Sequence, residues 1–400
     1  MTEEKVKAAL PELEKLAQQT LHKTGVPGMA IAVVHKDEVV YLKGFGVREI
    51  GTLEAVDVET IFQLASVSKP MASTVVAAII TDGKITWDSR ISDLDPEFQL
   101  YDPWVTHEVT LRDMFAHRSG LPDHAGDLLE DLGYSREEIL YRLRYQKPDS
   151  SFRAHYAYTN FGLTEAAVAA AKAAGKTWEE VAAEKLYQPL GMKHTSSRHV
   201  DFDASPNHAR LHVLADGKWV AKYQRNPDAQ SPAGGVSSSA RDMAQWLRLQ
   251  LGNRTFEGKQ VVDAAALAET HRPQVIQQPP QNAATDRAGF YGLGWNVSYD
   301  DRGRVRLSHS GAFNLGAATT VFLLPADELG IVVLTNAYPI GVAEALGASF
   351  FDLVLSGKVE KDWVELFGQA FATLLKPDYG TVIDYTKPPS QPSPALTSDA

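Results

Sequence analysis

The chain has 400 residues, 44% of them hydrophobic and 22% charged, which is enough for more than one compact unit with a buried core. Its 39 basic and 50 acidic residues give a formal net charge of -11, with no basic stripe to follow a phosphate backbone, so no nucleic acid partner is expected. The sequence has no cysteine, which excludes disulfide bonds and thiolate metal sites.

The first 21 residues are rich in Glu and Lys and lack the continuous apolar core of a signal peptide. We therefore expect a cytoplasmic protein, or a periplasmic or secreted one if a signal peptide was removed. No stretch reaches the roughly 20 apolar residues that cross a bilayer, so no membrane span is expected. The best candidates, the short runs at 71–80 and 317–324, fit buried elements better.

An amphipathic helix is predicted at residues 3–24, because apolar residues recur there at helical intervals and Gly25 then stops the pattern. Two runs rich in Val, Ile and Tyr follow, at 29–34 and 38–45. The polar turn 35–37 joins them, so the two runs predict an antiparallel hairpin.

Ser66 opens the next helical pattern. Apolar residues recur at helical spacing from Met71 to Ile79, and Gly83 follows as a helix stop. The pattern therefore places Ser66 at the N-terminus of a helix.

The long stretch 84–281 reads mainly as helices and loops, with helical patterns at 164–174, 178–186 and 240–251. Strand patterns return at 292–298, 305–310, 317–324 and 330–335, and helical patterns follow at 341–355 and 362–375. The two ends of the chain thus contain both strand and helix patterns, whereas the middle is mainly helical.

We interpret this pattern as an α/β (α+β) protein with an antiparallel sheet flanked by helices. The α/β domain is discontinuous, comprising 1–87 and 282–376, and a mainly helical domain, 88–281, is inserted between them. The active site is expected between the two domains. Residues 377–400 are rich in Pro and Ser and are predicted to form a tail or linker.

The first candidate for chemistry is the pair Ser66 and Lys69. A spacing of three positions on a helix brings the hydroxyl and the amine to the same face, within mutual reach. A lysine that loses its solvent is neutral near pH 7 and can take the serine proton. The spacing alone is not specific, because about one such pair is expected by chance in a chain of this length.

The second candidate lies in the turn before the predicted helix at 164–174, where Tyr158 and Asn160 stand two positions apart. A tyrosine close to cationic groups can carry a proton to a leaving group, and an asparagine amide can orient both a lysine and a substrate carbonyl. A buried aromatic residue and a turn asparagine would give the same pattern, so both interpretations stay open.

The third candidate is the strand end His309, Ser310, Gly311 and Ala312. Gly311 would let a substrate approach the strand closely. The backbone N–H groups of Ala312 and Ser66 could then form an oxyanion hole. Ordinary turn chemistry is the alternative.

In their order and context, these three segments resemble the serine β-lactamase and penicillin-binding protein superfamily, in particular its class C-like branch. That branch includes family VIII carboxylesterases and D-aminopeptidase-like serine hydrolases, which share S-x-x-K, Y-x-N and a strand motif such as K-T-G, H-x-G or W-x-G. All three motifs occur here in family order. Further segments that resemble the family are 109–122, 188–192, 232–239 and 291–295.

The resemblance implies a serine hydrolase that forms an acyl-enzyme on Ser66, with Lys69 and Tyr158 handling protons and no cofactor or metal. Asn160 would hold Lys69 and the substrate, which would be a small molecule or short peptide. His309 would contact the substrate or tune Tyr158. Because it stands where many relatives have a charged lysine, small esters, amides or D-amino-acid peptides are favoured over penicillins.

Three alternatives remain. The protein could be a penicillin-binding module that is acylated at Ser66 with little turnover, a weak β-lactamase, or a scaffold that has lost catalysis. Enzymes that have lost catalytic activity usually lack the nucleophile or the base, and both residue types are present here. The oligomeric state is not indicated by the sequence.

Overall fold

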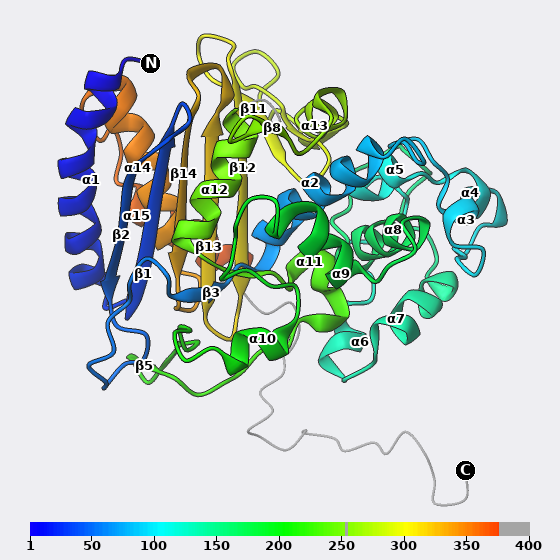
Figure 1. Ribbon diagram of the computed structural model, residues 1–400, viewed down its shortest axis with the longest axis horizontal. Coiled ribbons are helices and arrows are strands. Elements are labelled where there is room, and N and C mark those ends of the chain that lie inside the picture. The colour runs from blue at the N-terminus through cyan, green and yellow to red at the C-terminus, as the bar shows by residue number, and fades with distance from the viewer. Residues whose placement is uncertain (253–254, 376–400) are drawn as a thin grey trace, which may run out of the picture.

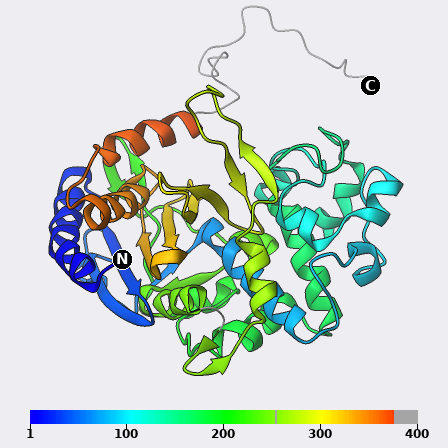
Figure 2. The same ribbon diagram turned by 90° about the horizontal axis from the view of Figure 1, so that it is seen from above.

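The computed structural model describes residues 1–252 and 255–375, and the predicted tail at 377–400 lies outside the described residues. A large antiparallel sheet occupies one half of the molecule, with helices on both faces, and a mainly helical part lies beside it (Figure 1). Seen from above, α1 (Glu3–Thr24), α14 (Val342–Ser356) and α15 (Trp363–Leu374) gather at the end opposite to this helical part (Figure 2).

The main sheet has eight strands in the order β2-β1-β14-β13-β12-β11-β10-β9, and each strand runs antiparallel to its neighbours. In that order the strands are Glu38–Gly46, Gly28–His35, Leu329–Thr335, Ala317–Leu324, Val305–Phe313, Asn296–Tyr299, Gly289–Tyr291 and Val275–Gln278. β1 and β14 are buried along their whole length. The first strand of the chain therefore pairs with the last.

Several predicted elements are confirmed, among them the helix at 3–24, the hairpin of β1 and β2, and the strand at 317–324. The single strand predicted at 292–298 is wrong. β10 ends at Tyr291 and β11 begins at Asn296, because Gly294 adopts a left-handed φ of 81° and the chain turns between them.

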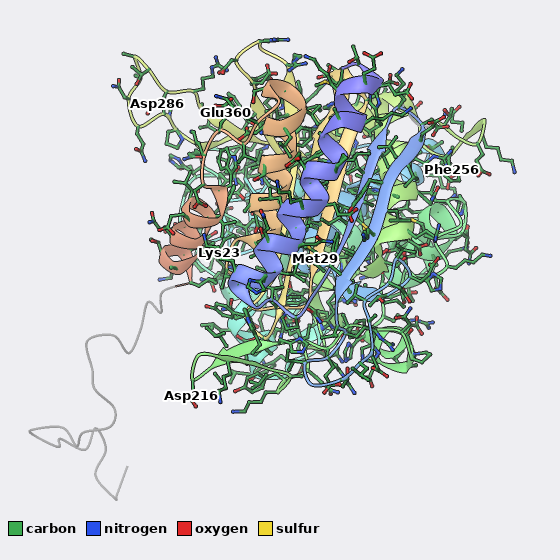
Figure 3. The ribbon with its side chains drawn as sticks, turned by 90° about the vertical axis from the view of Figure 1, so that its left-hand side faces the viewer. Lys23, Met29, Asp216, Phe256, Asp286 and Glu360 are labelled. Atoms are coloured by element: carbon green, nitrogen blue, oxygen red, sulfur yellow. The ribbon has the colours of Figure 1, made fainter. Side chains whose placement is uncertain are left out.

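The outer face of the sheet is covered by α1 and α14, which lie side by side across the strands (Figure 3). α14 approaches the sheet at Gly347, where an added Cβ would lie 2.5 Å from the ring of Phe322. The apolar residues between these layers form one of the two hydrophobic clusters of the described chain.

The inner face carries α12 (Ala240–Leu251) and α2 (Ser68–Thr81). Trp246 of α12 stacks on Trp295 with ring centroids 5.6 Å apart, and its indole N–H donates to the Thr74 hydroxyl on α2 at 3.2 Å. α12 and β9 come from the stretch 88–281, which was predicted as the helical domain, yet both pack with the sheet. The predicted domain limits stay a prediction.

Apart from the 14-residue α8, the remaining elements are short. The helices are α3 (Ile91–Leu94), α4 (Pro103–Glu108), α5 (Leu111–Phe115), α6 (Asp127–Asp131), α7 (Arg136–Arg142), α8 (Asn160–Ala173), α9 (Trp178–Ala182), α10 (His199–Ala204), α11 (Ser231–Gly234) and α13 (Ala264–Thr270). The strands are β3 (Ile61–Gln63), β4 (Val213–Ala215), β5 (Lys218–Val220), β6 (Ser237–Ser239), β7 (Thr255–Phe256) and β8 (Lys259–Gln260). The alanine-rich α8 is the buried centre of the helical part.

Within residues 1–252 and 255–375, none of the helices combines the length and the apolar character that a membrane crossing requires.

Glu344 gives a test of this packing. It lies on α14 against the sheet, is 3% exposed, and burial raises the pKa of its carboxyl to about 7. Because this pKa exceeds that of the unfolded chain, the contribution to stability is present at low pH and is lost as the pH rises through 7. The Glu344→Gln variant should gain about 2 to 3 kcal/mol relative to the wild type between pH 5 and pH 8.

Urea unfolding of both proteins at the two pH values measures this difference. Glu12, which is exposed on α1, provides the matched control Glu12→Gln. If the free energy of unfolding of Glu344→Gln differed from that of the wild type by the same amount at both pH values, the buried carboxyl would not titrate between them.

Candidate active site

Ser66 lies at the junction of α2 and the sheet. It sits in a 3₁₀ turn, Ala65–Val67, directly before α2, and its side chain is half-buried. Ala65 has a left-handed φ of 47°, a strained conformation for a residue with a Cβ. The Thr319 hydroxyl on β13 donates to the Leu64 carbonyl at 2.6 Å, and this bond holds the turn against the sheet. The backbone is thus bent to present Ser66 at a helix N-terminus.

Lys69 lies one helical turn further on and is fully buried. Its Nζ is 3.0 Å from Ser66 Oγ, 2.6 Å from Asn160 Oδ1 and 3.0 Å from the carbonyl oxygen of Ala233. Burial lowers the pKa of the amine to about 7, and the carboxylate of Asp127 opposes this shift. A large fraction of Lys69 is therefore neutral near pH 7.

The three contacts of Lys69 determine where its lone pair points. As a cation, Lys69 donates to all three oxygen atoms. A neutral amine has two N–H groups, which the carbonyl oxygens of Asn160 and Ala233 accept. The lone pair then faces Ser66 Oγ and can accept the serine proton.

Tyr158 reaches the same oxygen from the other side. Its hydroxyl donates to Ser66 Oγ at 2.7 Å, and its ring lies 4.4 Å from Lys69 Nζ. Burial raises the pKa of the phenol well above its usual value, so Tyr158 is a neutral proton donor. The ring of His117 packs against it at 4.8 Å, and His117 Nδ1 accepts the Thr159 N–H at 3.1 Å.

Asn160 is the first residue of α8 and is nearly fully buried. Its Oδ1 accepts from Lys69, while its Nδ2 donates to Asp127 Oδ2 at 2.8 Å. Asp127 begins α6, and the same Oδ2 is 2.7 Å from His124 Nδ1. The Y-x-N segment thus connects the nucleophile to a second polar group.

His309 is buried, and both of its ring nitrogens have partners. Nδ1 lies 2.8 Å from the Ser310 carbonyl oxygen, so this nitrogen carries the hydrogen, and Nε2 accepts from the Tyr291 hydroxyl at 2.9 Å. Burial lowers the pKa of the imidazole to about 3. Its ring centroid is 6.5 Å from that of Tyr158. His309 is therefore neutral, and its predicted contact with substrate or effect on Tyr158 stays a prediction.

Gly311 lies where β12 comes close to the turn that carries Ser66. A Cβ at this position would overlap the Leu64 carbonyl oxygen and lie 2.9 Å from the backbone nitrogen of Ser66. Ala312 follows directly and pairs with Ala318 across the sheet. The strand thus runs beside the Ser66 backbone, and the oxyanion hole of Ser66 and Ala312 stays a prediction.

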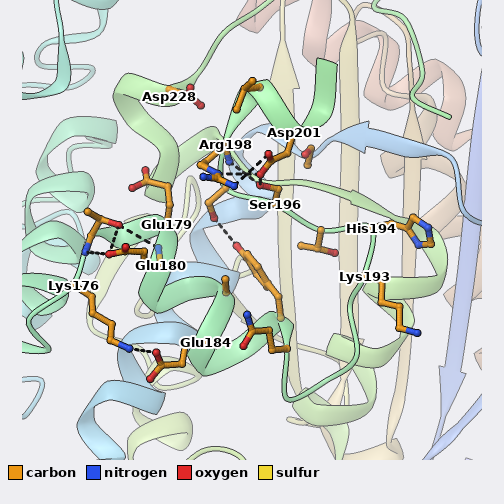
Figure 4. Close-up of a pocket in the computed structure, with 18 of the residues that line it drawn as sticks. Lys176, Glu179, Glu180, Glu184, Lys193, His194, Ser196, Arg198, Asp201 and Asp228 are labelled. Carbon is orange, nitrogen blue, oxygen red and sulfur yellow. Dashed lines mark hydrogen bonds and ion pairs between the residues drawn. The ribbon is translucent and has the colours of Figure 1, made fainter. Parts of the chain in front are cut away.

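A cavity of about 1010 Å³ does not include Ser66 among its lining residues. It lies beside α9, and Figure 4 shows the charged side chains of its wall in pairs, such as Lys176 with Glu184 and Arg198 with Asp201. No group of three or more His, Asp or Glu side chains in the part of the chain that the structure describes could hold a metal ion.

The structure brings Lys69, Tyr158, Asn160 and Gly311 close to Ser66, and it adds other residues. Sequence reasoning missed Asp127, His124, Ala233, Tyr291 and His117 as neighbours of the site. The signal available for Asp127 and His124 was their place directly after segment 109–122, which resembles the family. Ala233 and Tyr291 lie within segments 232–239 and 291–295, which also resemble the family, but nothing in the spacing pointed to their contacts with the site.

Residues 13–348 match the family model described as Beta-lactamase. The chain belongs to the Beta-lactamase family. This confirms the resemblance drawn from the motifs. A solved structure with the same fold is the octameric penicillin-binding protein homologue from Pyrococcus abyssi, with a TM-score of 0.76, 21% identity, and coverage of 88% of this chain and 79% of that one. The predicted fold class is confirmed.

Curated members of the Beta-lactamase family are similar along most of this chain. The unguisins hydrolase ungD' of Aspergillus campestris is 26% identical, over 82% of this chain and 61% of that protein. The D-alanyl-D-alanine-carboxypeptidase/endopeptidase AmpH of Escherichia coli is 23% identical, over 86% and 89%. Penicillin-binding protein 4 of Amycolatopsis lactamdurans is 26% identical, over 82% and 84%. The chain thus spans about three fifths of the unguisins hydrolase.

Gly311→Ala tests the junction of β12 with Ser66 in this member of the Beta-lactamase family. The added methyl group forces the strand away from the Ser66 backbone, so hydrolysis of p-nitrophenyl acetate should fall by about 100-fold or more. Gly289→Ala on β10 is the matched control, because its Cβ meets the Gln278 side chain at an ordinary 3.4 Å. Thermal unfolding of both variants checks the fold, and full activity in folded Gly311→Ala would contradict the close approach.

Proposed function

We propose that the protein is a serine hydrolase that forms a covalent acyl-enzyme on Ser66. The observation that carries the proposal is the environment of Lys69, a buried amine whose two N–H groups are taken by Asn160 and Ala233. Its lone pair is left for the Ser66 hydroxyl. This is the arrangement that activates a serine without a histidine.

The reaction proceeds in two halves. Ser66 Oγ attacks the substrate carbonyl carbon while its proton moves to Lys69 Nζ, and the backbone N–H groups of Ser66 and Ala312 stabilise the oxyanion. The carbon–leaving group bond then breaks, Tyr158 gives its proton to the leaving group, and Lys69 returns a proton to Tyr158. In the second half, water attacks the acyl carbonyl carbon and Ser66 Oγ is the leaving group. This step releases the acid and restores Ser66.

The site favours substrates without a carboxylate beside the scissile bond. At the strand position where many relatives carry a lysine, His309 is neutral and is bonded to Tyr291 and Ser310. Small esters, amides and D-amino-acid peptides fit such a site better than penicillins do. The printed name of AmpH includes an endopeptidase, an enzyme that cleaves peptides away from a terminal carboxylate, and this supports peptide substrates of that kind.

The first test compares the wild type with Ser66→Ala on p-nitrophenyl acetate, p-nitrophenyl butyrate, a D-alanyl p-nitroanilide and nitrocefin, with the intact mass measured after each reaction. We expect turnover of the esters or the D-alanyl amide and none by Ser66→Ala. A mass adduct on Ser66 without turnover would replace this proposal with a penicillin-binding module. Equal rates for the two proteins and no adduct would contradict the proposal.

A second test is the pH dependence of the wild type. Lys69 acts as a base only when neutral, and burial lowers its pKa to about 7. With p-nitrophenyl butyrate, kcat/KM should therefore rise tenfold per pH unit below about 7 and level off above it. Ser66→Ala supplies the background of spontaneous hydrolysis at each pH. A profile that stays flat down to pH 5 would show that a different group takes the proton.

A third test replaces the base. Lys69→Arg keeps a positive charge, but a guanidinium stays protonated and cannot accept the serine proton. We expect kcat to fall by about 100- to 10,000-fold. Lys185→Arg on the protein surface, where Lys185 pairs with Asp82, is the control and should retain full activity. Near wild-type activity in Lys69→Arg would exclude Lys69 as the base.

A further inference from the structure

Two side chains outside the three motifs continue the hydrogen-bonded chain that starts at Ser66. From Lys69 the chain passes to Asn160 at 2.6 Å, from Asn160 Nδ2 to Asp127 Oδ2 at 2.8 Å, and from Asp127 to His124 Nδ1 at 2.7 Å. Asp127 and His124 belong to the turn that starts α6, and the proton transfers above do not use them.

The carboxylate of Asp127 decides which way the Asn160 amide faces. An amide can present either its oxygen or its NH₂ group to a neighbour, but a carboxylate only accepts hydrogen bonds. Asp127 therefore selects the orientation with Nδ2 toward itself and Oδ1 toward Lys69. In the reverse orientation, Lys69 would lose one of the two acceptors that leave its lone pair facing Ser66.

The turn that carries Asp127 is built to hold this position. His124 adopts a left-handed φ of 56°, and its backbone N–H donates to the Tyr158 carbonyl at 2.7 Å. Gly126 has a φ of 94°, and a Cβ there would lie 2.9 Å from Ile139 and 3.0 Å from Phe161. A strained backbone that is packed this closely fixes the carboxylate relative to α8.

We propose that Asp127, held by His124, is a positioning residue that fixes the Asn160 side chain with its oxygen toward Lys69 and thereby keeps the Lys69 amine aimed at Ser66. This inference rests on the proposed function. It assigns Asp127 no contact with substrate.

The charges around this hydrogen-bonded chain determine whether the loss of Asp127 raises or lowers the pKa of Lys69. The hydrogen bond to Asp127 raises the pKa of His124, while Asp127 raises the pKa of Lys69 and burial lowers it. The other titratable groups that face Lys69, Asp127 or His124 are His117, Asp123, Glu130, Tyr158 and His309, and Arg225 pairs with Glu130. Loss of the Asp127 charge therefore lowers the pKa of Lys69. The acid limb of the pH–rate profile then moves to lower pH.

The decisive variant is Asp127→Asn, measured with p-nitrophenyl butyrate from pH 5 to pH 9. We expect kcat to fall by about 10- to 100-fold with little change in KM, because the base is misaligned while substrate binding is untouched. The acid limb should move down by about 1 pH unit. Asp131→Asn, at the exposed end of the same helix, is the matched control and should leave all three quantities unchanged.

His124 gives a second test that does not depend on the folding of Asp127→Asn. Asn and Gly both tolerate the left-handed backbone at this position. His124→Asn keeps an N–H donor close to the place of Nδ1 and should retain kcat. His124→Gly removes the donor and should lower kcat by about 10-fold at constant KM.

The outcomes separate this inference from the proposed function. If the wild type neither turns over an ester nor is acylated at Ser66, the proposed function fails. If the wild type is active and folded Asp127→Asn keeps its kcat and its acid limb, the positioning role is overturned and the catalytic assignment stands. If Asp127→Asn does not fold, equal kcat values for His124→Gly and His124→Asn overturn it instead.

Discussion

The burial of one amine is the constraint on which the rest of the site depends. A charged lysine is expensive to remove from water, so a fully buried Lys69 exists only because oxygen atoms surround it and because it can lose its proton near neutral pH. Those oxygen atoms come from the turn that precedes α2, from α8 and from α11. Folding the helical part against α2 therefore also prepares the base.

The nucleophile is fixed by the sheet in a complementary way. Ala65 is held in a left-handed conformation, and Gly311 brings β12 so close to the Ser66 backbone that no side chain fits between them. The left-handed conformation of Ala65 is costly for the local backbone, and the surrounding packing sustains it. The site thus combines a strained turn at Ala65, which the sheet holds, with the desolvated amine of Lys69, which the helical part buries.

Much of this arrangement was predictable from local pattern. The three-residue spacing of Ser66 and Lys69 places them on one helix face, and that prediction needs no other part of the chain. The strands 305–310 and 317–324 were likewise visible in their composition. Asp127 and Tyr291 were not, because their roles depend on tertiary contacts with residues 33 and 18 positions away. The break at 292–295 was missed because Gly294 ends a strand pattern through its backbone conformation, which hydropathy does not record.

The hydrogen bond between His309 and Tyr291 connects the arrangement of the strands to the proposed substrate selectivity. Tyr291 ends β10 and His309 lies on β12, so the contact spans two strands of the main sheet and is set by their register through β11. A histidine there has its hydrogen directed at the Ser310 carbonyl and its other nitrogen occupied by a phenol, so it offers a substrate neither a charge nor a free donor. Replacing the imidazole by a lysine would not simply restore a carboxylate site, because the buried Tyr291 hydroxyl and the Ser310 carbonyl are arranged to complement a neutral ring. The proposed selectivity against anionic substrates would thus depend on the sheet as well as on one residue.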